Sequence, residues 1–117
     1  MLVACASDPV SYIVFLDNQR PTPVIVKVVV ERTDQPVLTD EFVVPSAAKT
    51  LRQEGIDESV SSVNVSVFYA SCAPVGTAAV PANRSLVSIS SAGVAIASGD
   101  TSTFDSTLAT RLTGPPC

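Results

Sequence analysis

The sequence predicts an all-β fold, an antiparallel sandwich of about seven strands. Apolar and polar residues alternate with a period of two over most of the 117 residues, which is the pattern of half-buried strands. Pro, Gly, Asn and Asp separate the apolar runs at nearly regular spacing, as turns do between neighbouring strands. No segment has the spacing of apolar residues that indicates an amphipathic helix.

The first two predicted strands are the most apolar. Residues 11–17 (SYIVFLD) form the first, and the prolines of NQRPTP at 18–23 end it. Residues 23–33 form the second, with four valines on one face: Val24, Val26, Val28 and Val30. The other face mixes apolar and charged side chains, so we expect it to be partly covered: Ile25, Lys27, Val29 and Glu31.

The middle of the chain continues the pattern. The turn TDQP leads into residues 37–45, which predict a returning strand with Phe42 and Val44 on one face. Residues 50–52 predict a short strand that is followed by a loop. Residues 62–71 alternate cleanly and predict a central strand whose inward face is Val63, Val65, Val67 and Tyr69.

The last third is richer in turn residues. Residues 72–84 (CAPVGTAAVPANR) predict a long loop because they contain two prolines and a glycine. Residues 85–99 predict a hairpin that turns at SAG, with Val87 and Ile89 facing Val94 and Ile96. Residues 101–113 are expected to complete the sheet, anchored by Phe104 and Leu108.

Strand number and spacing over about 100 residues resemble those of immunoglobulin-like domains. The inter-sheet cysteine pair and the buried tryptophan of antibody domains are missing, so the resemblance is one of architecture. A small β-barrel is the alternative, because alternation does not distinguish two packed sheets from one closed sheet. The length predicts a single domain, residues 10–117.

Composition argues against several functions. The chain has no histidine, the usual general base and the commonest metal ligand, so Ser/His/Asp and Cys/His sites cannot be assembled from it. The acids lack the spacing of a calcium loop, and we expect no metal site, no cofactor and no enzymatic activity. A net charge of −4 with seven scattered bases argues against nucleic acid as a partner.

Residues 2–5 (LVAC) resemble the lipobox of bacterial lipoproteins, in which an aliphatic, a variable and a small residue precede an acylated cysteine. The resemblance covers four residues, and the polar stretch ASDP follows them. It implies that Cys5 carries the lipid and that residues 1–9 are a signal remnant, lipid anchor and spacer. The mature protein would then be held at the cell envelope, outside the cytoplasm, with membrane contact only through the anchor. The alternative is that Cys5 is a small apolar residue at the edge of the first strand.

The two other cysteines, Cys72 and Cys117, predict a disulfide if Cys5 is lipidated. Such a bridge would tie the end of the chain to the loop at 72–84 and implies an oxidising compartment. Without lipidation, a Cys5–Cys117 bridge is the competing pairing, and unpaired thiols in a reducing cytosol are the third possibility.

The loops are the expected place for recognition, because a rigid sandwich positions them. We expect NQRPTP, EGIDES and CAPVGTAAVPANR to gather at one end. Their charged residues are the candidate binding residues: Arg20, Asp57, Glu58 and Arg84.

Two roles fit these observations. The first is an exported, envelope-anchored module that binds or scaffolds a protein or another envelope component. The second is a structural subunit of an extracellular assembly, such as a virion decoration protein or a pilus-like filament, in which small sandwiches pair strand edges.

Overall fold

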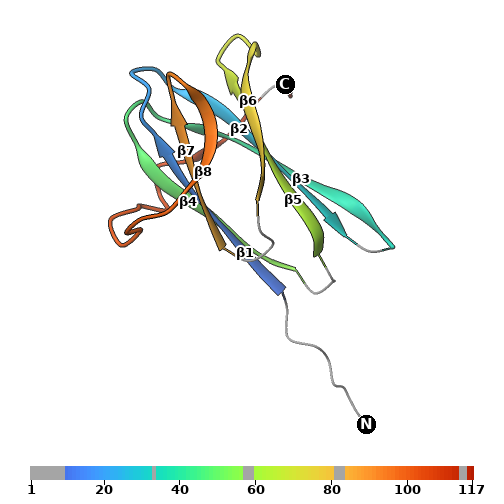
Figure 1. Cartoon of the computed structure of the whole chain (residues 1–117). Coiled ribbons are helices and arrows are strands. Elements are labelled where there is room, and N and C mark those ends of the chain that lie inside the picture. The colour runs from blue at the N-terminus through green and yellow to red at the C-terminus, as the bar shows by residue number, and fades with distance from the viewer. Residues whose placement is uncertain (1–9, 33, 57–59, 81–83, 114–115) are drawn as a thin grey trace.

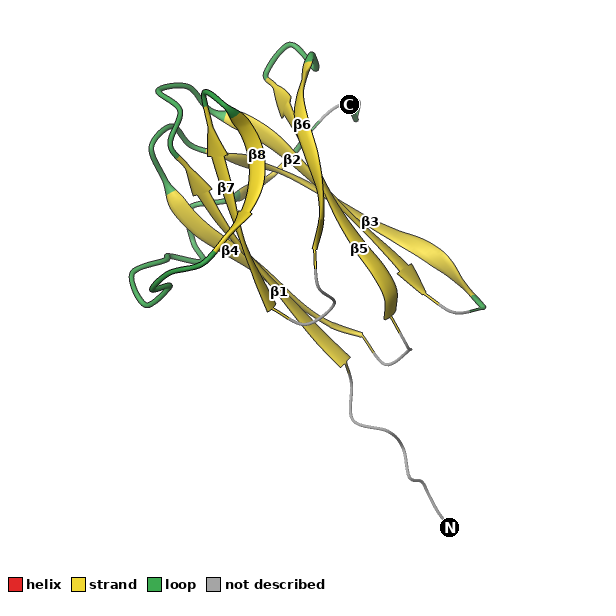
Figure 2. Cartoon of the chain, viewed as in Figure 1, coloured by secondary structure: helices red, strands yellow, loops and turns green. Residues whose placement is uncertain are grey.

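The computed structural model describes residues 10–32, 34–56, 60–80, 84–113 and 116–117. These residues form two β-sheets packed face to face, and they do not close into a barrel (Figures 1 and 2). The all-β sandwich predicted from the sequence is therefore confirmed. None of the described residues belongs to a helix, so none lies in a helix that is long and apolar enough to cross a membrane.

The first sheet has four strands in the order β4-β1-β7-β8. Their bounds are Val10–Asn18 for β1, Lys49–Ile56 for β4, Arg84–Ser90 for β7 and Gly93–Ala97 for β8. The second sheet has five strands in the order β6-β5-β2-β3-β9. Their bounds are Val24–Arg32 for β2, Gln35–Val44 for β3, Val60–Tyr69 for β5, Pro74–Val80 for β6 and Thr110–Arg111 for β9.

The strand order is not that of an immunoglobulin constant domain. There the first two strands belong to one sheet, whereas here β1 and β2 lie in opposite sheets. One pairing is also parallel, that of β1 with β7, and the other pairings between named strands are antiparallel. The resemblance to immunoglobulin domains is thus confined to the sandwich architecture.

Alternating side chains of both sheets build the core. Val26 and Val28 of β2 lie opposite Val67 and Val65 of β5, and all four are fully buried. Phe42 of β3 is the largest fully buried side chain. The two predicted faces of the last hairpin also meet, with Val87 opposite Ile96 and Ile89 opposite Val94.

The outer face of β1 is covered at Phe15. Phe15 is 5% exposed although its neighbours Val14 and Leu16 take the core face. The ring of Phe104 packs edge-on against Phe15, with ring centroids 5.5 Å apart. Burial on both sides explains why the sequence of β1 is apolar at consecutive positions rather than at alternate ones.

Two predicted elements were wrong in extent. The segment 72–84 is not one long loop, because Pro74–Val80 forms strand β6 at the edge of the second sheet. Its pairing with β5 contains a register shift at Val67/Phe68, which is consistent with a proline at its first position. Strand β4 continues to Ile56 instead of ending at Arg52, since β1 pairs with it along its whole length.

Two residues that were predicted to face the core or to anchor a segment also differ. Tyr69 was expected inward, but it ends β5 and is 37% exposed. Leu108 is 37% exposed and does not anchor the last segment, whereas Phe104 does through its contact with Phe15. Most of residues 101–113 lies outside the sheets: Thr110–Arg111 forms a short strand that pairs with β3, and Asp105 forms an isolated bridge with Thr50.

Candidate functional site

The predicted loops do not all meet at one end. Arg20 follows the end of β1 at Asn18, whereas β4 leads toward Asp57 from Ile56, which pairs with Val10 at the opposite end of β1. Arg84 begins β7 next to Ile13, also away from the Arg20 end. The expectation therefore holds only in part: strand directions place the ends of β4 and β6 away from Arg20, whereas NQRPTP and the start of CAPVGTAAVPANR at Cys72 lie at the same end, beside Tyr69.

Several candidate residues lie outside what the structure describes. Cys5, Asp57 and Glu58 belong to the residues without a described placement, and the side chain of Arg84 is not described either. Arg20, Cys72 and Cys117 are the predicted site residues whose surroundings the structure shows.

The end of the sandwich that carries Arg20 is organised by Asn18. This residue is 1% exposed, and its Nδ2 donates to the carbonyl oxygens of Thr22 at 3.1 Å and Pro45 at 2.9 Å. Its Oδ1 accepts from the backbone N–H of Arg20 at 3.1 Å. One buried amide thus joins the β1–β2 loop to the β3–β4 loop. The sequence analysis missed Asn18, and the only signal was an Asn that precedes a proline-containing turn.

Backbone hydrogen bonds tie the same loops together. The amide of Ala47 donates to the carbonyl of Arg20 at 3.0 Å, and the amide of Gln19 donates to the carbonyl of Ile89 at 2.8 Å. The loop at 18–23 therefore contacts both the β3–β4 loop and the start of the β7–β8 turn. This end is a preformed surface, because its loops are held by bonds rather than only by their strands.

Arg20 lies at the centre of this surface. Its Nη1 donates to the carbonyl of Ser90 at 2.7 Å, and its Nη2 donates to the hydroxyl of Tyr69 at 2.8 Å. Its Cζ also lies 4.9 Å from the centroid of the Tyr69 ring, within cation–π range. The guanidinium is half-buried, and its Nε is inaccessible to solvent and has no hydrogen-bond partner. Arg20 therefore holds three loops together while Tyr69 remains partly exposed.

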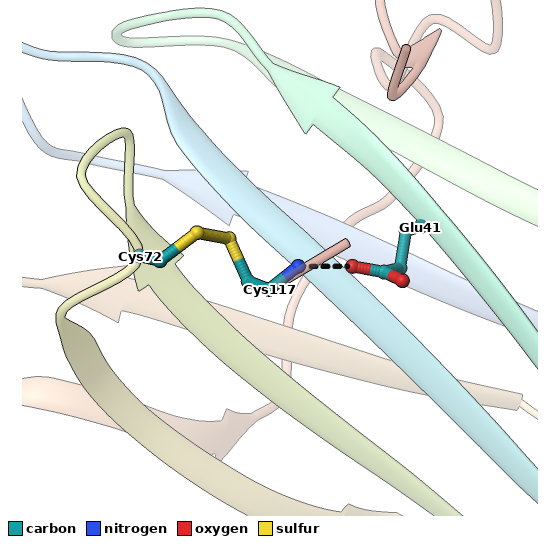
Figure 3. Close-up of a disulfide and its surroundings, with 3 residues drawn as sticks. All are labelled: Glu41, Cys72 and Cys117. Atoms are coloured by element: carbon teal, nitrogen blue, oxygen red, sulfur yellow. Dashed lines mark hydrogen bonds between the residues drawn. A yellow bond between two sulfur atoms is a disulfide. The ribbon is translucent and has the colours of Figure 1, made fainter. Parts of the chain in front are cut away.

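A disulfide joins Cys72 to Cys117, as predicted for a chain with Cys5 lipidated (Figure 3). The bridge spans 45 residues of sequence and connects the turn after β5 to the last residue. The backbone N–H of Cys117 donates to Oε2 of Glu41 on β3 at 3.2 Å. Because β2 lies between β3 and β5 in the sheet, the end of the chain crosses the outer face of β2.

We call the described residues 110–113 and 116–117 the C-terminal strap. It starts at β9, which pairs with Phe42 and Val43, and the amide of Leu112 then donates to the carbonyl of Glu41 at 3.1 Å. On the face that the strap crosses, Ile25 lies between Val43 and Phe68 by register and is 7% exposed. A disulfide of this kind persists in oxidising surroundings and so favours a location outside the cytoplasm.

The segment at 98–109 covers the outer edge of β4. Asp105 forms a bridge with Thr50, whose Oγ1 donates to the Asp105 carbonyl at 2.7 Å. Asp105 also accepts from the amide and hydroxyl of Thr107, and these bonds lower the pKa of its carboxyl. Bonds from Ser102 lower the pKa of Asp100 in the same way. Both carboxylates close local turns, and this explains the Ser/Thr/Asp composition of the segment.

One ion pair connects the two sheets. Arg52 of β4 donates through Nε at 3.0 Å and Nη2 at 2.8 Å to Oδ2 of Asp40 on β3. The Asp40 side chain is 12% exposed, and its Oδ1 has no hydrogen-bond partner. The Arg52 guanidinium also lies 5.1 Å from the centroid of the Phe42 ring. These groups tie the sheets together and do not form a nucleophile or an acid–base pair.

Among the described residues, no three Cys, Asp or Glu side chains gather in a way that could hold a metal ion. The charged groups described above are instead engaged within the fold. At the Arg20 end, hydrogen bonds join the loops, and Arg20 and Tyr69 lie at the centre of the resulting surface. No protein-family model, curated protein or solved structure matches the chain.

Proposed function

We propose that the protein is a non-enzymatic, exported β-sandwich module that is anchored at the cell envelope and presents a binding or scaffolding surface. The contact surface is the end formed by residues 18–23, 45–48, 69–73 and 90–92. The partner is a protein or another component of the envelope.

The Arg20–Tyr69 pair is the observation that carries this proposal. Tyr and Arg are enriched at the energetic centres of protein interfaces, because a fixed aromatic ring and a planar cation lose little conformational freedom on binding. Here the ring is 37% exposed, and the guanidinium is held in place by Ser90 and by the Tyr69 hydroxyl. A partner would find this pair already arranged.

The direction of β1 is consistent with a contact surface that faces away from a membrane anchor at Cys5. Strand β1 runs from Val10 to Asn18, so a lipid at Cys5 would be attached at the end opposite to Arg20. The contact surface would then point away from the membrane. The Cys72–Cys117 bridge agrees with an oxidising location.

Intact mass, with and without reductant, tests the anchoring of the protein made from its own gene in its own cells. A mass that begins at Cys5 with added acyl chains and gains two hydrogens on reduction supports the proposal. An unacylated chain that retains Met1 contradicts the lipid anchor.

Site-specific photocrosslinking in the same cells tests the surface. A photoreactive residue at Thr22 or Ala92 should give adducts, because both positions are exposed at the Arg20 end. Thr103, exposed on the segment that covers β4, is the matched control. Equal adducts at all three positions, or none at Thr22 and Ala92, would contradict the proposed surface.

A further inference from the structure

Arg20 carries the only charge on the contact surface. The other residues of 18–23, 45–48, 69–73 and 90–92 are Asn, Gln, Pro, Thr, Ser, Ala, Tyr and Cys. The chain as a whole is acidic, with a net charge of −4. The contact surface is therefore a neutral area with a single cation on a protein that is negative overall.

This cation has no anionic partner in the described part of the chain. The acceptors of its two hydrogen bonds, the Ser90 carbonyl and the Tyr69 hydroxyl, are both neutral. No described carboxylate lies within ion-pair distance of the guanidinium, and Asp17, three residues earlier, accepts from Gln19 instead. A half-buried guanidinium has lost part of its hydration, and an anion compensates that loss better than a neutral acceptor does.

The outer side of the Arg20 guanidinium is open to a partner. Its Nε is inaccessible to solvent, and the bond from Nη1 to Ser90 is partly buried. The bond from Nη2 to the Tyr69 hydroxyl, by contrast, lies on the exposed side. Nη2 has a second N–H, and the hydroxyl oxygen that accepts from Nη2 still has its own O–H to donate. These two donors are adjacent, because Nη2 and the hydroxyl oxygen are 2.8 Å apart.

We propose that the partner of the contact surface is a protein that places one carboxylate, from an Asp or Glu side chain, against Arg20 and Tyr69. One carboxylate oxygen would accept from Nη2 of Arg20, and the other would accept from the hydroxyl of Tyr69. The hydroxyl is a stronger donor here because it already accepts from a cation. This inference rests on the proposed function, since it names the chemistry of the partner at the same surface.

The neutral surroundings of Arg20 favour a protein over a polyanion as the source of the carboxylate. Nucleic acids and anionic membranes present many charges and are held by several cations, whereas this surface offers one. Small apolar side chains are exposed around it: Pro21, Pro23, Ala47, Ala70 and Ala92. The cores of protein interfaces have a similar composition, in which Arg and Tyr are enriched and Lys, Asp and Glu are depleted.

NMR titration of the full chain with two peptides tests this chemistry. The tripeptide Ala-Glu-Ala, acetylated and amidated at its ends, carries the carboxylate, and the matching Ala-Gln-Ala has the same shape without the charge. The amide signals of residues 69–73 and 90–92 report binding. We expect saturable shifts with the Glu peptide and an affinity at least about tenfold higher than that of the Gln peptide.

Three variants assign the binding to the two donors. Arg20→Ala should abolish binding of the Glu peptide, and Tyr69→Phe should weaken it about tenfold, because it removes one hydrogen bond to a charged acceptor. Tyr69→Phe keeps the ring, so it decides alone if Arg20→Ala fails to fold. Arg111→Ala is the matched control, because it removes an exposed arginine on β9, outside the contact surface, and it should leave the affinity unchanged.

Equal affinity for the two peptides, no binding of the Glu peptide, or an unchanged affinity in Tyr69→Phe would overturn the inference. Stronger binding of the unacylated chain to phosphatidylglycerol vesicles than to phosphatidylcholine vesicles would also overturn it, since the anion would then belong to a membrane. Photocrosslinking at Thr22 and Ala92 keeps the two proposals distinct. Adducts without a preference for the Glu peptide remove only this inference, whereas a lack of adducts removes the contact surface itself.

Discussion

The guanidinium of Arg20 both stacks on the ring of Tyr69 and donates a hydrogen bond to its hydroxyl, across 49 residues of sequence. Through its bond to the carbonyl of Ser90, the same side chain also reaches the β7–β8 turn. A residue that the sequence suggested as a binding group is thus also a structural tie between three loops.

Arg20→Ala should therefore lower the free energy of unfolding by about 1–3 kcal/mol, because it removes two hydrogen bonds from a charged donor. Tyr69→Phe should cost less, about 0.5–1.5 kcal/mol, since the ring contact remains. Urea denaturation measures both. Arg111→Ala is the control, an exposed arginine on β9 for which we expect a change within about 0.5 kcal/mol. Equal effects of Arg20→Ala and Arg111→Ala would contradict the structural role.

Removing the Cys72–Cys117 bridge should lower the free energy of unfolding by about 4 kcal/mol, because a crosslink over 45 residues restricts the unfolded chain. The double variant Cys72→Ser/Cys117→Ser, measured by urea denaturation, avoids mispaired thiols. Trypsin should also cut after Arg111 faster in this variant, since only β9 and neighbouring contacts then hold the strap. Addition of reductant should speed trypsin cleavage after Arg111 in the native protein but leave the cleavage rate of the variant unchanged. Unchanged cutting would show that the bridge does not hold the strap.

Breaking the Asp40–Arg52 pair should destabilise the packing of the two sheets. Asp40→Ala leaves the Arg52 guanidinium beside Phe42 without this acceptor, and we expect a loss of about 1–3 kcal/mol. A double-mutant cycle with Arg52→Ala isolates the pair, with an expected coupling of at least about 0.5 kcal/mol. A coupling near zero would mean that the two side chains contribute independently.

Acid should loosen the segment at 98–109 before the rest of the fold. Hydrogen bonds from Thr107 and Ser102 lower the pKa values of Asp105 and Asp100 in the folded protein. A carboxyl with a depressed folded pKa stabilises the fold above its unfolded pKa, and this stabilisation is lost as the pH falls through the folded pKa. The effect therefore belongs to the range below the ordinary Asp value of about 3.9.

NMR amide signals of Ser102 and Thr107 measure this transition. Asp105→Asn should remove the acid-dependent change at Thr107 and leave that at Ser102. Asp34→Asn, at an exposed turn position with φ of 57°, is the control and should alter neither. If the Thr107 amide signal of Asp105→Asn still changes with acid as it does in the unmodified protein, the Asp105 carboxyl is not the group responsible.

Much of the fold could be predicted because local pattern and burial agree. The alternation of β2 and β5 predicted their valines in the core, and SAG between two apolar runs predicted a hairpin in which Val87 and Ile89 face Val94 and Ile96. Strand β6 was missed because Pro74, Gly76 and its alanines read locally as a loop. Those residues form a strand because β5 supplies hydrogen-bonding partners and because Gly76 lets Val94 approach closely.

The candidate site depended more on tertiary structure. The Cys72–Cys117 bridge was predicted only on the condition that Cys5 is lipidated, and the structure shows that these two cysteines pair. Strand direction, however, decides which loops share an end, and period-two alternation is the same for a strand that runs either way. That is why Arg20 and Arg84 were grouped by sequence, although Arg20 follows the end of β1 and Arg84 pairs with Ile13 within it.

By itself, the sequence determined the all-β class, most strands, the core faces and the absence of histidine chemistry, because these depend on composition and on neighbours along the chain. Only the tertiary structure decided the sheet order, the role of Asn18 and the burial of Phe15 against Phe104. Each of these depends on contacts between segments far apart in sequence, and such contacts leave no periodic signal in either segment.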